Sequence, residues 1–553
     1  MRATSFSRGR RGERTGWTAI GLAAALATFP AEASAAEPIV YTVTVAAPET
    51  HYADVRATYP TGGRGVIELM MPVWSPGFYR VEDYASRVED LSARSPRDDR
   101  PLIVERPRPN RWRVQAQGAP TVVVTYRLRC DGRSVTTNAL NESLLVLNPA
   151  AALLTLAGGL RRPHEIRLEL PEAWKAAMSG LDAARDGALN HFIAPDYDTL
   201  VDRPILAGHL SVHEFTVDGV PHQLAEAGTH GHWDAARAAQ DLEKIVRGTR
   251  DYWGRLPFRR YVFLNVFRQG GGGLEHGNST LLTSSPELQA PTLRWLSFVG
   301  HEYFHAFNVK RLRPIELGPF DYEAPPTTSS LWISEGLTTY GADLVVVRAG
   351  LATTDEFLTL ISNNIATLQG SPGRLKQTLA QASLDVWNSG TSGVGRDPEN
   401  LVSYYVKGPV VGFLLDVKIQ RATRGKKSLQ DVMRLAYRRY GGARGFTADE
   451  FRKTAEDIAK TDLGDSFHSW LASTDELDYA EALDWFGLKF TNEPGSTKPW
   501  QLAVRAEASF EQMKRLRTWL KQTPQAAYHP RSDAATLRTT FRTCTSTRRS
   551  RSS

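Results

Sequence analysis

Cysteine is almost absent from this sequence. The chain of 553 residues contains two, Cys130 and Cys544, which stand far apart and in different surroundings. Two cysteines exclude a disulfide framework, and they also exclude a zinc site built from several thiolates. The chain must therefore be stabilised by an apolar core, and its 41% of apolar residues is an ordinary content for a folded protein.

A long apolar run is also missing. The run at residues 17–29 falls short of the ~20 residues that span a bilayer, and no later segment approaches that length. It follows an arginine-rich stretch and precedes Ala33 and Ala35, small residues at the −3 and −1 positions of a cleavage site. We therefore predict a secretory signal peptide at residues 1–35, with an uncleaved membrane anchor as the alternative. The signal peptide predicts export, and the low cysteine content favours a bacterial periplasm or secretion as the destination. We expect no stable membrane insertion after cleavage.

The body of the chain lacks an excess of positive charge. The formal net charge is +7, but residues 1–35 hold five arginines against two glutamates, and residues 531–553 hold six arginines against one aspartate. Subtracting both ends from the total leaves about −1 for the rest. No basic stripe remains to bind phosphates, so we expect no nucleic-acid partner.

Two patterns divide the body of the chain. From residue 37 to 220, short segments alternate apolar and polar residues between turn-forming residues, which predicts an antiparallel β domain without catalytic residues. From 221 to 492 helical spacing predominates, with an amphipathic helix expected at 232–254, ending on Gly254, and a strand at 261–267. The predicted fold class is α+β, an N-terminal antiparallel β domain followed by a mainly helical domain.

The strongest chemical signal is the motif His-Glu-x-x-His at residues 301–305. Residues four apart project from the same face of a helix, so His301 and His305 can converge on one metal ion with Glu302 beside it. The surrounding segment is apolar, and burying these three side chains there is costly unless a metal uses them. A buried histidine pair that binds no metal is the alternative.

A catalytic zinc ion usually takes three protein ligands and keeps a fourth position for water. Glu335, thirty residues after His305 in a second apolar helical stretch, is the best candidate for the third ligand, although it could be an exposed carboxylate. We therefore expect one Zn²⁺ per chain, held by His301, His305 and Glu335. Glu302 can then take a proton from the activated water and deliver it to a leaving amine.

The segments HEYFHAFNVKRLRP and LWISEGLTTY resemble the glycyl aminopeptidase family, zinc metallopeptidases of the gluzincin group. The resemblance extends over most of the chain, from about residue 37 to 491. It implies a thermolysin-like catalytic domain and peptide substrates with a free N-terminus. It also implies hydrolysis of the N-terminal residue, with small residues such as Gly or Ala preferred.

A run of four glycines and a carboxylate follows the expected strand at 261–267. Glycines let a ligand approach the backbone closely, and a lone carboxylate after them can bind a cation, although a flexible loop with an incidental acid is the simpler alternative. The run is similar to the Gly-x-Met-Glu-Asn element of related aminopeptidases, with His276 in the Asn place. By this resemblance Glu275 binds the substrate α-amine, and the glycines line the peptide along an edge strand. The substrate-binding set is Gly271, Gly272, Gly273, Leu274, Glu275 and His276.

Tyr405, in the sequence Tyr-Val-Lys-Gly, resembles a tyrosine of zinc aminopeptidases. In those enzymes its hydroxyl meets the tetrahedral intermediate, so the resemblance makes Tyr405 the second catalytic residue beside Glu302. Tyr404 is the competing choice. The two differ by about 100° in helical phase, so only one can face the metal, and the motif register favours Tyr405.

The C-terminal segment departs from the family pattern. Family members commonly carry a C-terminal PDZ domain, but the 53 residues after Trp500 are too few for one and show no strand alternation. Residues 493–553 are therefore predicted to be a truncated or disordered tail, with a shifted reading frame as one hypothesis and a nucleic-acid-binding tail as the alternative.

Two other functions stay open at this point. A zinc endopeptidase or another amide hydrolase of the same fold would share the metal site, and a non-catalytic peptide-binding protein would share only the fold. The presence of every ligand type favours an enzyme, and an amine anchor at Glu275 favours an aminopeptidase.

Overall fold

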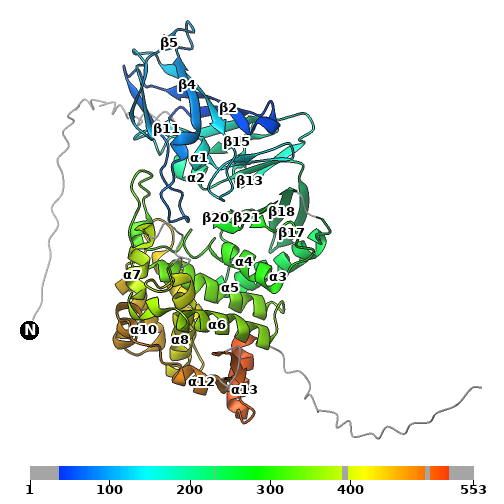
Figure 1. Cartoon of the computed structure of the whole chain (residues 1–553), viewed down its shortest axis with the longest axis vertical. Coiled ribbons are helices and arrows are strands. Elements are labelled where there is room, and N and C mark those ends of the chain that lie inside the picture. Colours follow the sequence, from blue (N-terminus) through cyan, green and yellow to red (C-terminus); the bar gives the residue numbers. More distant parts are fainter. Residues whose placement is uncertain (1–35, 229–230, 389–396, 492–498, 522–553) are drawn as a thin grey trace, which may run out of the picture. The chain divides into compact units, whose positions relative to one another are not determined.

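The computed structural model describes residues 36–228, 231–388, 397–491 and 499–521 (Figure 1). Its N-terminal region contains three sheets. The largest sheet has the strand order β14-β15-β12-β1-β2-β8-β4-β5, and two four-stranded sheets have the orders β13-β16-β10-β9 and β11-β3-β7-β6. Every pair is antiparallel except β1 and β12, because β12 joins the free side of β1 after a long excursion of the chain. The expected antiparallel β domain is confirmed apart from this pair.

These strands show the alternation that the sequence predicts. In β1, every second side chain is buried, because one face of the sheet packs on the core and the other is open to solvent. The strands are β1 Ile39–Thr44, β2 Tyr52–Pro60, β3 Ile67–Met70, β4 Val88–Arg94, β5 Pro101–Leu102, β6 Val104–Arg108, β7 Arg111–Val114, β8 Thr121–Arg129, β9 Ala139–Leu140, β10 Leu144–Leu147, β11 Thr155–Leu156, β12 His164–Glu169, β13 Ala176–Ser179, β14 Asp182–Ala183, β15 His191–Ala194 and β16 Ile205–Gly208. Two short helices, α1 Pro149–Ala152 and α2 Tyr197–Val201, connect them.

A five-stranded sheet begins the catalytic region, in the order β17-β18-β19-β21-β20. Its strands are β17 Ser211–Val217, β18 Val220–Gly228, β19 Tyr261–Phe267, β20 Gly272–Glu275 and β21 Ser279–Ser284. The strand expected at 261–267 is confirmed as β19. Every residue of β19 is buried, because one face packs on the helices and the other on the four-stranded sheet that contains β10 and β16.

The β17–β18 hairpin places the regional boundary earlier than residue 220. That expected boundary falls within the hairpin turn, and both strands belong to the five-stranded sheet. The sequence reads as a hairpin here, but local alternation does not reveal which sheet a hairpin joins. Hydrogen bonding of β18 along β19 shows that the catalytic region starts at about Ser211.

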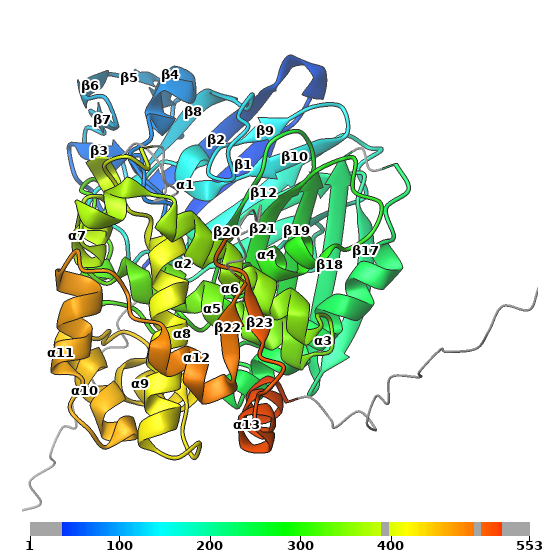
Figure 2. The ribbon, with the colours of Figure 1, turned by 60° about the horizontal axis from the view of Figure 1, so that its bottom comes forward.

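Helices make up most of the catalytic region (Figure 2). The expected helix at 232–254 is confirmed as α3, and Gly254 ends it with a left-handed φ of 90°. The helices are α3 Ala235–Trp253, α4 Leu293–Phe304, α5 Leu337–Arg348, α6 Thr354–Gln369, α7 Leu379–Leu384, α8 Tyr404–Ala422, α9 Leu429–Tyr440, α10 Ala448–Ala459, α11 Gly464–Phe467 and α12 Ala480–Phe486. The expected α+β fold class is thus confirmed.

Part of the segment expected as a disordered tail is folded. β23 (Leu502–Val504) pairs with β22 (Leu488–Phe490), and α13 (Phe510–Leu520) buries Trp519 and Leu520. Trp519 stacks on Phe486 at 4.3 Å between ring centroids, and together with buried Leu516 and Leu520 it attaches the short helix to the core. The expectation for residues 493–553 is therefore wrong for 499–521, and the rest of that range lies outside the described residues.

The expected signal peptide at residues 1–35 also lies outside the described residues. Within the part of the chain that the structure describes, none of the helices combines the length and the apolar character needed to cross a membrane.

Candidate metal centre and peptide site

Helix α4 positions both histidines of the motif. The Thr292 side chain caps its first turn by accepting a hydrogen bond from Trp295 N, and the helix ends at Phe304. His305 is the C-cap and still donates its backbone N–H to His301 O, so the two rings remain one helical turn apart. Their centroids lie 4.5 Å apart and their Nε2 atoms 2.9 Å apart.

Glu335 reaches the histidines from a π-helical turn. This turn, Trp332–Gly336, precedes α5 and shifts the register of the helix by one residue, an arrangement often found at functional sites. Gly336 contacts Gly408 of α8 so closely that a methyl group on either would overlap backbone atoms of the other. The two glycines therefore let the segment that carries Glu335 pack directly on α8.

The three side chains converge on one point. Glu335 Oε2 lies 3.4 Å from His301 Nε2 and 3.2 Å from His305 Nε2. In the described part of the chain, these residues form a group whose potential ligand atoms all lie within 4.8 Å of one another. Two imidazoles and a carboxylate are a ligand set of catalytic zinc sites, so the chemistry of the donors fits this metal.

Hydrogen bonds behind the rings direct the Nε2 atoms toward that point. His305 Nδ1 lies 2.9 Å from Asn308 O, and His301 Nδ1 lies 3.1 Å from the Thr339 hydroxyl. A proton on Nδ1 of His305 leaves the Nε2 lone pair free for a metal. Asn308 in turn donates to Ile333 O at 2.7 Å, which ties the end of α4 to the segment of Glu335.

The two glutamates of the centre have opposite electrostatics. Burial opposes the charge on Glu335, but His305 and His301 outweigh burial and lower the pKa of Glu335 to about 2. Burial raises the pKa of Glu302 well above its usual range, and nearby Glu275 adds to the shift. Glu335 is thus a permanent anion suited to a metal, whereas Glu302 binds a proton readily, as a general base must.

Strand β20 lies against Glu302. A methyl group on Gly273 would overlap the Glu302 carboxylate, so the close approach requires glycine. β20 pairs with β21 on one side and is the last strand of its sheet, so its other edge can accept hydrogen bonds from an extended peptide.

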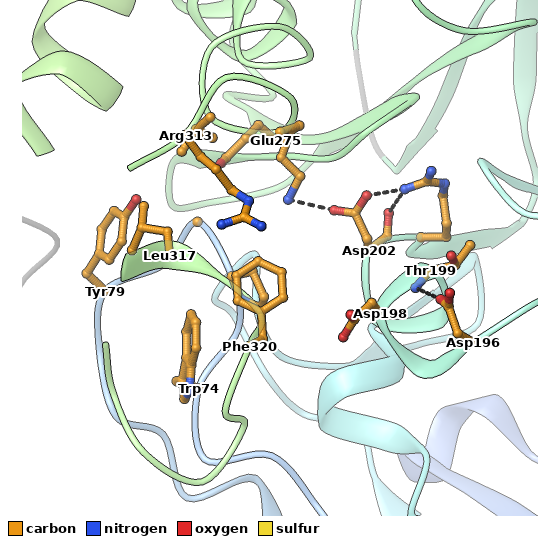
Figure 3. A pocket seen from close by; sticks show the side chains of 15 residues that line it. Trp74, Tyr79, Asp196, Asp198, Thr199, Asp202, Glu275, Arg313, Leu317 and Phe320 are labelled. Carbon is orange, nitrogen blue, oxygen red and sulfur yellow. Dashed lines mark hydrogen bonds and ion pairs between the residues drawn. The ribbon is translucent and has the colours of Figure 1, made fainter. Parts of the chain in front are cut away.

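Glu275, at the end of β20, borders a cavity of about 230 Å³. Figure 3 shows Glu275 and Arg313 facing Trp74 and Phe320 across this cavity. Glu275 is 3% exposed, and its Oε1 atom has no hydrogen-bond partner among the described residues. Burial raises the pKa of Glu275, so a cation entering the cavity would be a favourable partner for its carboxylate.

Asp202 connects the two regions at the wall of this cavity. Lys310 Nζ lies 2.6 Å from Asp202 Oδ1, and Gly277 donates its backbone N–H to Oδ2 at 2.8 Å. Burial opposes the charge on Asp202, but Lys310 and Arg203 lower its pKa well below the usual range. The ion pair with Lys310 ties the N-terminal region to the segment after α4, and the Gly277 hydrogen bond ties it to the loop that follows Glu275.

The other residues of the predicted substrate-binding set are placed differently. Gly272 and Gly273 belong to β20 and Gly271 precedes it. The Leu274 side chain packs in the core between the two regions, and buried His276 faces Asp202 at 3.4 Å between Nδ1 and Oδ1. Burial lowers the pKa of His276 to about 4, so its ring is neutral near pH 7. The structure brings Gly273 and Glu275 to the centre, but not the side chains of Leu274 or His276.

Tyr405 is the tyrosine next to the histidines. Its ring lies 6.1 Å from the His301 ring and is half-buried at the start of α8. Tyr404 is fully buried, and its hydroxyl has no hydrogen-bond partner within the described chain. The two rings lie 4.9 Å apart, and they differ in that Tyr404 is fully buried whereas Tyr405 is the one whose ring contact with His301 is seen.

Sequence reasoning missed the part that the N-terminal region plays. Trp74, Gly77 and Tyr79 line the cavity, and a methyl group on Gly77 would overlap the Glu275 carboxylate. Asp198 and Asp202 at the other wall also come from this region. The segment WSPGFYR, with aromatic residues around a Pro-Gly turn, is the one signal in the sequence that sets this loop apart.

Comparison with protein families identifies the chain. Residues 40–209 match the peptidase M61 N-terminal domain, and residues 294–411 match the M61 glycyl aminopeptidase domain. The chain belongs to the M61 glycyl aminopeptidase family. The family resemblance noted in the sequence is thus confirmed, and membership makes this protein a peptidase.

Solved structures agree with this family. An aminopeptidase N family protein from Idiomarina loihiensis is 27% identical, with 83% of this chain and 82% of that chain covered and a TM-score of 0.77. A mutant of the M1 zinc metallopeptidase from Deinococcus radiodurans is 12% identical, with 80% and 95% covered and a TM-score of 0.50, which shows a shared fold. No curated protein matches the sequence.

Proposed function

We propose that this M61 protein is a zinc aminopeptidase with one Zn²⁺ per chain, held by His301, His305 and Glu335. The observation that carries the proposal is the convergence of these three side chains, with Glu302 against β20 and Glu275 in the adjoining cavity. A zinc ion in such a site polarises the scissile carbonyl and makes water more acidic.

The residues of the chain then have distinct roles. Glu302 takes a proton from the attacking water and returns it to the leaving amine. Tyr405, beside His301, donates a hydrogen bond to the oxygen that becomes negative in the transition state. The backbone of β20 holds the peptide in an extended conformation.

Glu275 makes the enzyme an aminopeptidase. A substrate with a free N-terminus carries an ammonium group, and the buried carboxylate without a partner on Oε1 is its natural acceptor. By resemblance to the family, the preferred N-terminal residues are Gly and Ala.

The test combines metal content with amine release. Purified protein is expected to hold one zinc per chain and to release Gly and Ala from their amides, but not from N-acetylated peptides. Glu335→Gln is expected to lose most of its zinc. The control is Glu49→Gln, which changes an exposed glutamate far in sequence from the metal ligands and is expected to keep its zinc. Full zinc content in Glu335→Gln would reject the assigned ligand set, and cleavage of acetylated peptides alone would indicate an endopeptidase.

A further inference from the structure

A second hollow, of about 910 Å³, has a lining rich in arginine and free of acidic residues. Arg255 follows α3, Arg311 follows α4, and Arg434 and Arg438 lie one turn apart on α9. The aromatic residues Trp253 and Tyr437 complete the relevant wall. Four guanidinium groups from three segments of the chain thus face one space.

Among the described residues, two of these arginines donate their hydrogen bonds to neutral acceptors. Arg434 donates to the backbone carbonyls of Asp251 and Tyr252. Arg311 donates to Gly277 O at 2.8 Å and to Ala306 O. A carbonyl orients a guanidinium group but does not neutralise it, and neither arginine has a carboxylate within ion-pair distance among the described residues.

The other two arginines have no carboxylate within ion-pair distance in the described part of the chain. Arg255 lies over the Tyr437 ring at 5.3 Å, and Arg438 is exposed on α9. Arg434 and Arg438 are like charges four residues apart on a helix, an arrangement that destabilises a helix unless an anion separates them.

Trp253 adds a further donor, and no acceptor, to the residues that line the hollow. The side chain is 7% exposed, and its indole N–H has no hydrogen-bond partner among the described residues. A buried donor without a partner is costly. The polar side-chain groups of this wall are therefore mainly donors, and a molecule that satisfies them must be an acceptor with negative charge.

We propose that this hollow binds a phosphate-bearing anion. A carboxylate brings one negative charge, whereas a phosphate group brings nearly two and three acceptor oxygens, which matches several guanidinium groups around one space. Another hollow, of about 590 Å³, also contains basic residues but differs from the arginine-lined one. Acidic residues line it as well, and Lys427 pairs with Asp431 at 3.0 Å. The anion site is separate from the proposed peptidase chemistry, because none of the metal-site residues lines it.

Calorimetric titration of the full chain with inorganic pyrophosphate tests the proposal. We expect saturable binding that chloride at equal ionic strength does not reproduce. The double variant Arg255→Gln, Arg438→Gln is expected to bind about tenfold more weakly or worse, because it removes two charged donors. The matched control is Arg133→Gln, Arg161→Gln, two exposed arginines of the N-terminal region, and it should bind as the parent does.

A second arm distinguishes the source of the phosphate. Binding to free pyrophosphate supports a soluble ligand, whereas binding only to vesicles that contain phosphatidic acid, a lipid with a phosphate monoester, supports a lipid headgroup in the same hollow. Absence of saturable binding in both arms, or equal weakening by the control variant, would overturn the proposal. Binding does not depend on turnover, so this result is independent of the peptidase test.

Discussion

The candidate metal centre and the cavity around Glu275 adjoin each other but are built in different ways. The metal side comes from the catalytic region alone, and the Nδ1 atoms behind its histidine rings already have partners. The cavity has walls from both regions, and Glu275 Oε1 has no partner among the described residues. The metal side is thus organised by the protein itself, whereas the cavity is completed by a positively charged ligand. Chemistry and substrate choice should therefore respond to different substitutions.

The largest effect is expected from Glu302→Gln, on the metal side. Glutamine keeps the shape but cannot take a proton, so turnover should fall by about 10²- to 10⁴-fold while zinc stays bound. Steady-state hydrolysis of Gly-amide and metal analysis of the same preparation check both parts. A variant that kept most of its activity would remove Glu302 from the role of base.

Gly273→Ala should have the next largest effect, because it moves Glu302 without changing it. The added methyl would overlap the carboxylate, and a displacement of about 1 Å costs on the order of 100-fold in rate. Gly271→Ala is the matched control, since a methyl group there meets no atom within 4 Å. The rate constant for hydrolysis should fall in Gly273→Ala and not in Gly271→Ala. Equal losses in both variants would mean that this loop tolerates no side chain at all.

Glu275→Gln tests the cavity side of the comparison. Loss of one charged hydrogen bond costs about 1.5–3 kcal/mol, so kcat/KM for substrates with a free amine should fall about 10- to 100-fold. Zinc content should not change, and any slow cleavage of acetylated peptides should be unaffected. Glu49→Gln serves as the control for removing a carboxylate. Equal losses on free and acetylated substrates would argue against an amine anchor.

Sequence reasoning succeeds where the determining contacts are local. The spacing of His301 and His305 fixes their relation because one helical turn separates them, and β19 is recognisable because all its residues except Asn265 are apolar or aromatic. The π-helical turn at Glu335 is not visible in the pattern, since its register depends on packing between Gly336 and Gly408. The same reason limits the prediction at the C-terminus, where α13 is attached by long-range contacts such as the stacking of Trp519 on Phe486.

Long-range contacts explain why the cavity side was harder to foresee. Gly77 meets Glu275 across almost two hundred residues of sequence, and Asp202 meets Lys310 across more than one hundred. A single sequence contains no record of such pairings. The metal side was therefore predictable in outline, whereas the cavity walls required the structure.

Asp343 should have the smallest effect on activity, because it concerns the stability of the metal side and not its chemistry. This buried residue of α5 accepts a hydrogen bond from Ser297 of α4, and burial raises its pKa to about 7. Its ordinary value is 3.8, so between about pH 4 and 7 the folded state retains a proton that the unfolded state loses. Stability therefore falls as pH rises through this window, and above pH 7 the loss is complete.

Asp343→Asn is neutral at every pH and can still accept the Ser297 hydrogen bond. Its free energy of unfolding in urea should equal that of the parent near pH 4 and exceed it by about 4 kcal/mol at pH 8, because the pKa of Asp343 rises from 3.8 to about 7 on folding. A difference that stayed constant between the two pH values would show that Asp343 is ionised in both states, and the α4–α5 contact would then carry a charged carboxylate without cost.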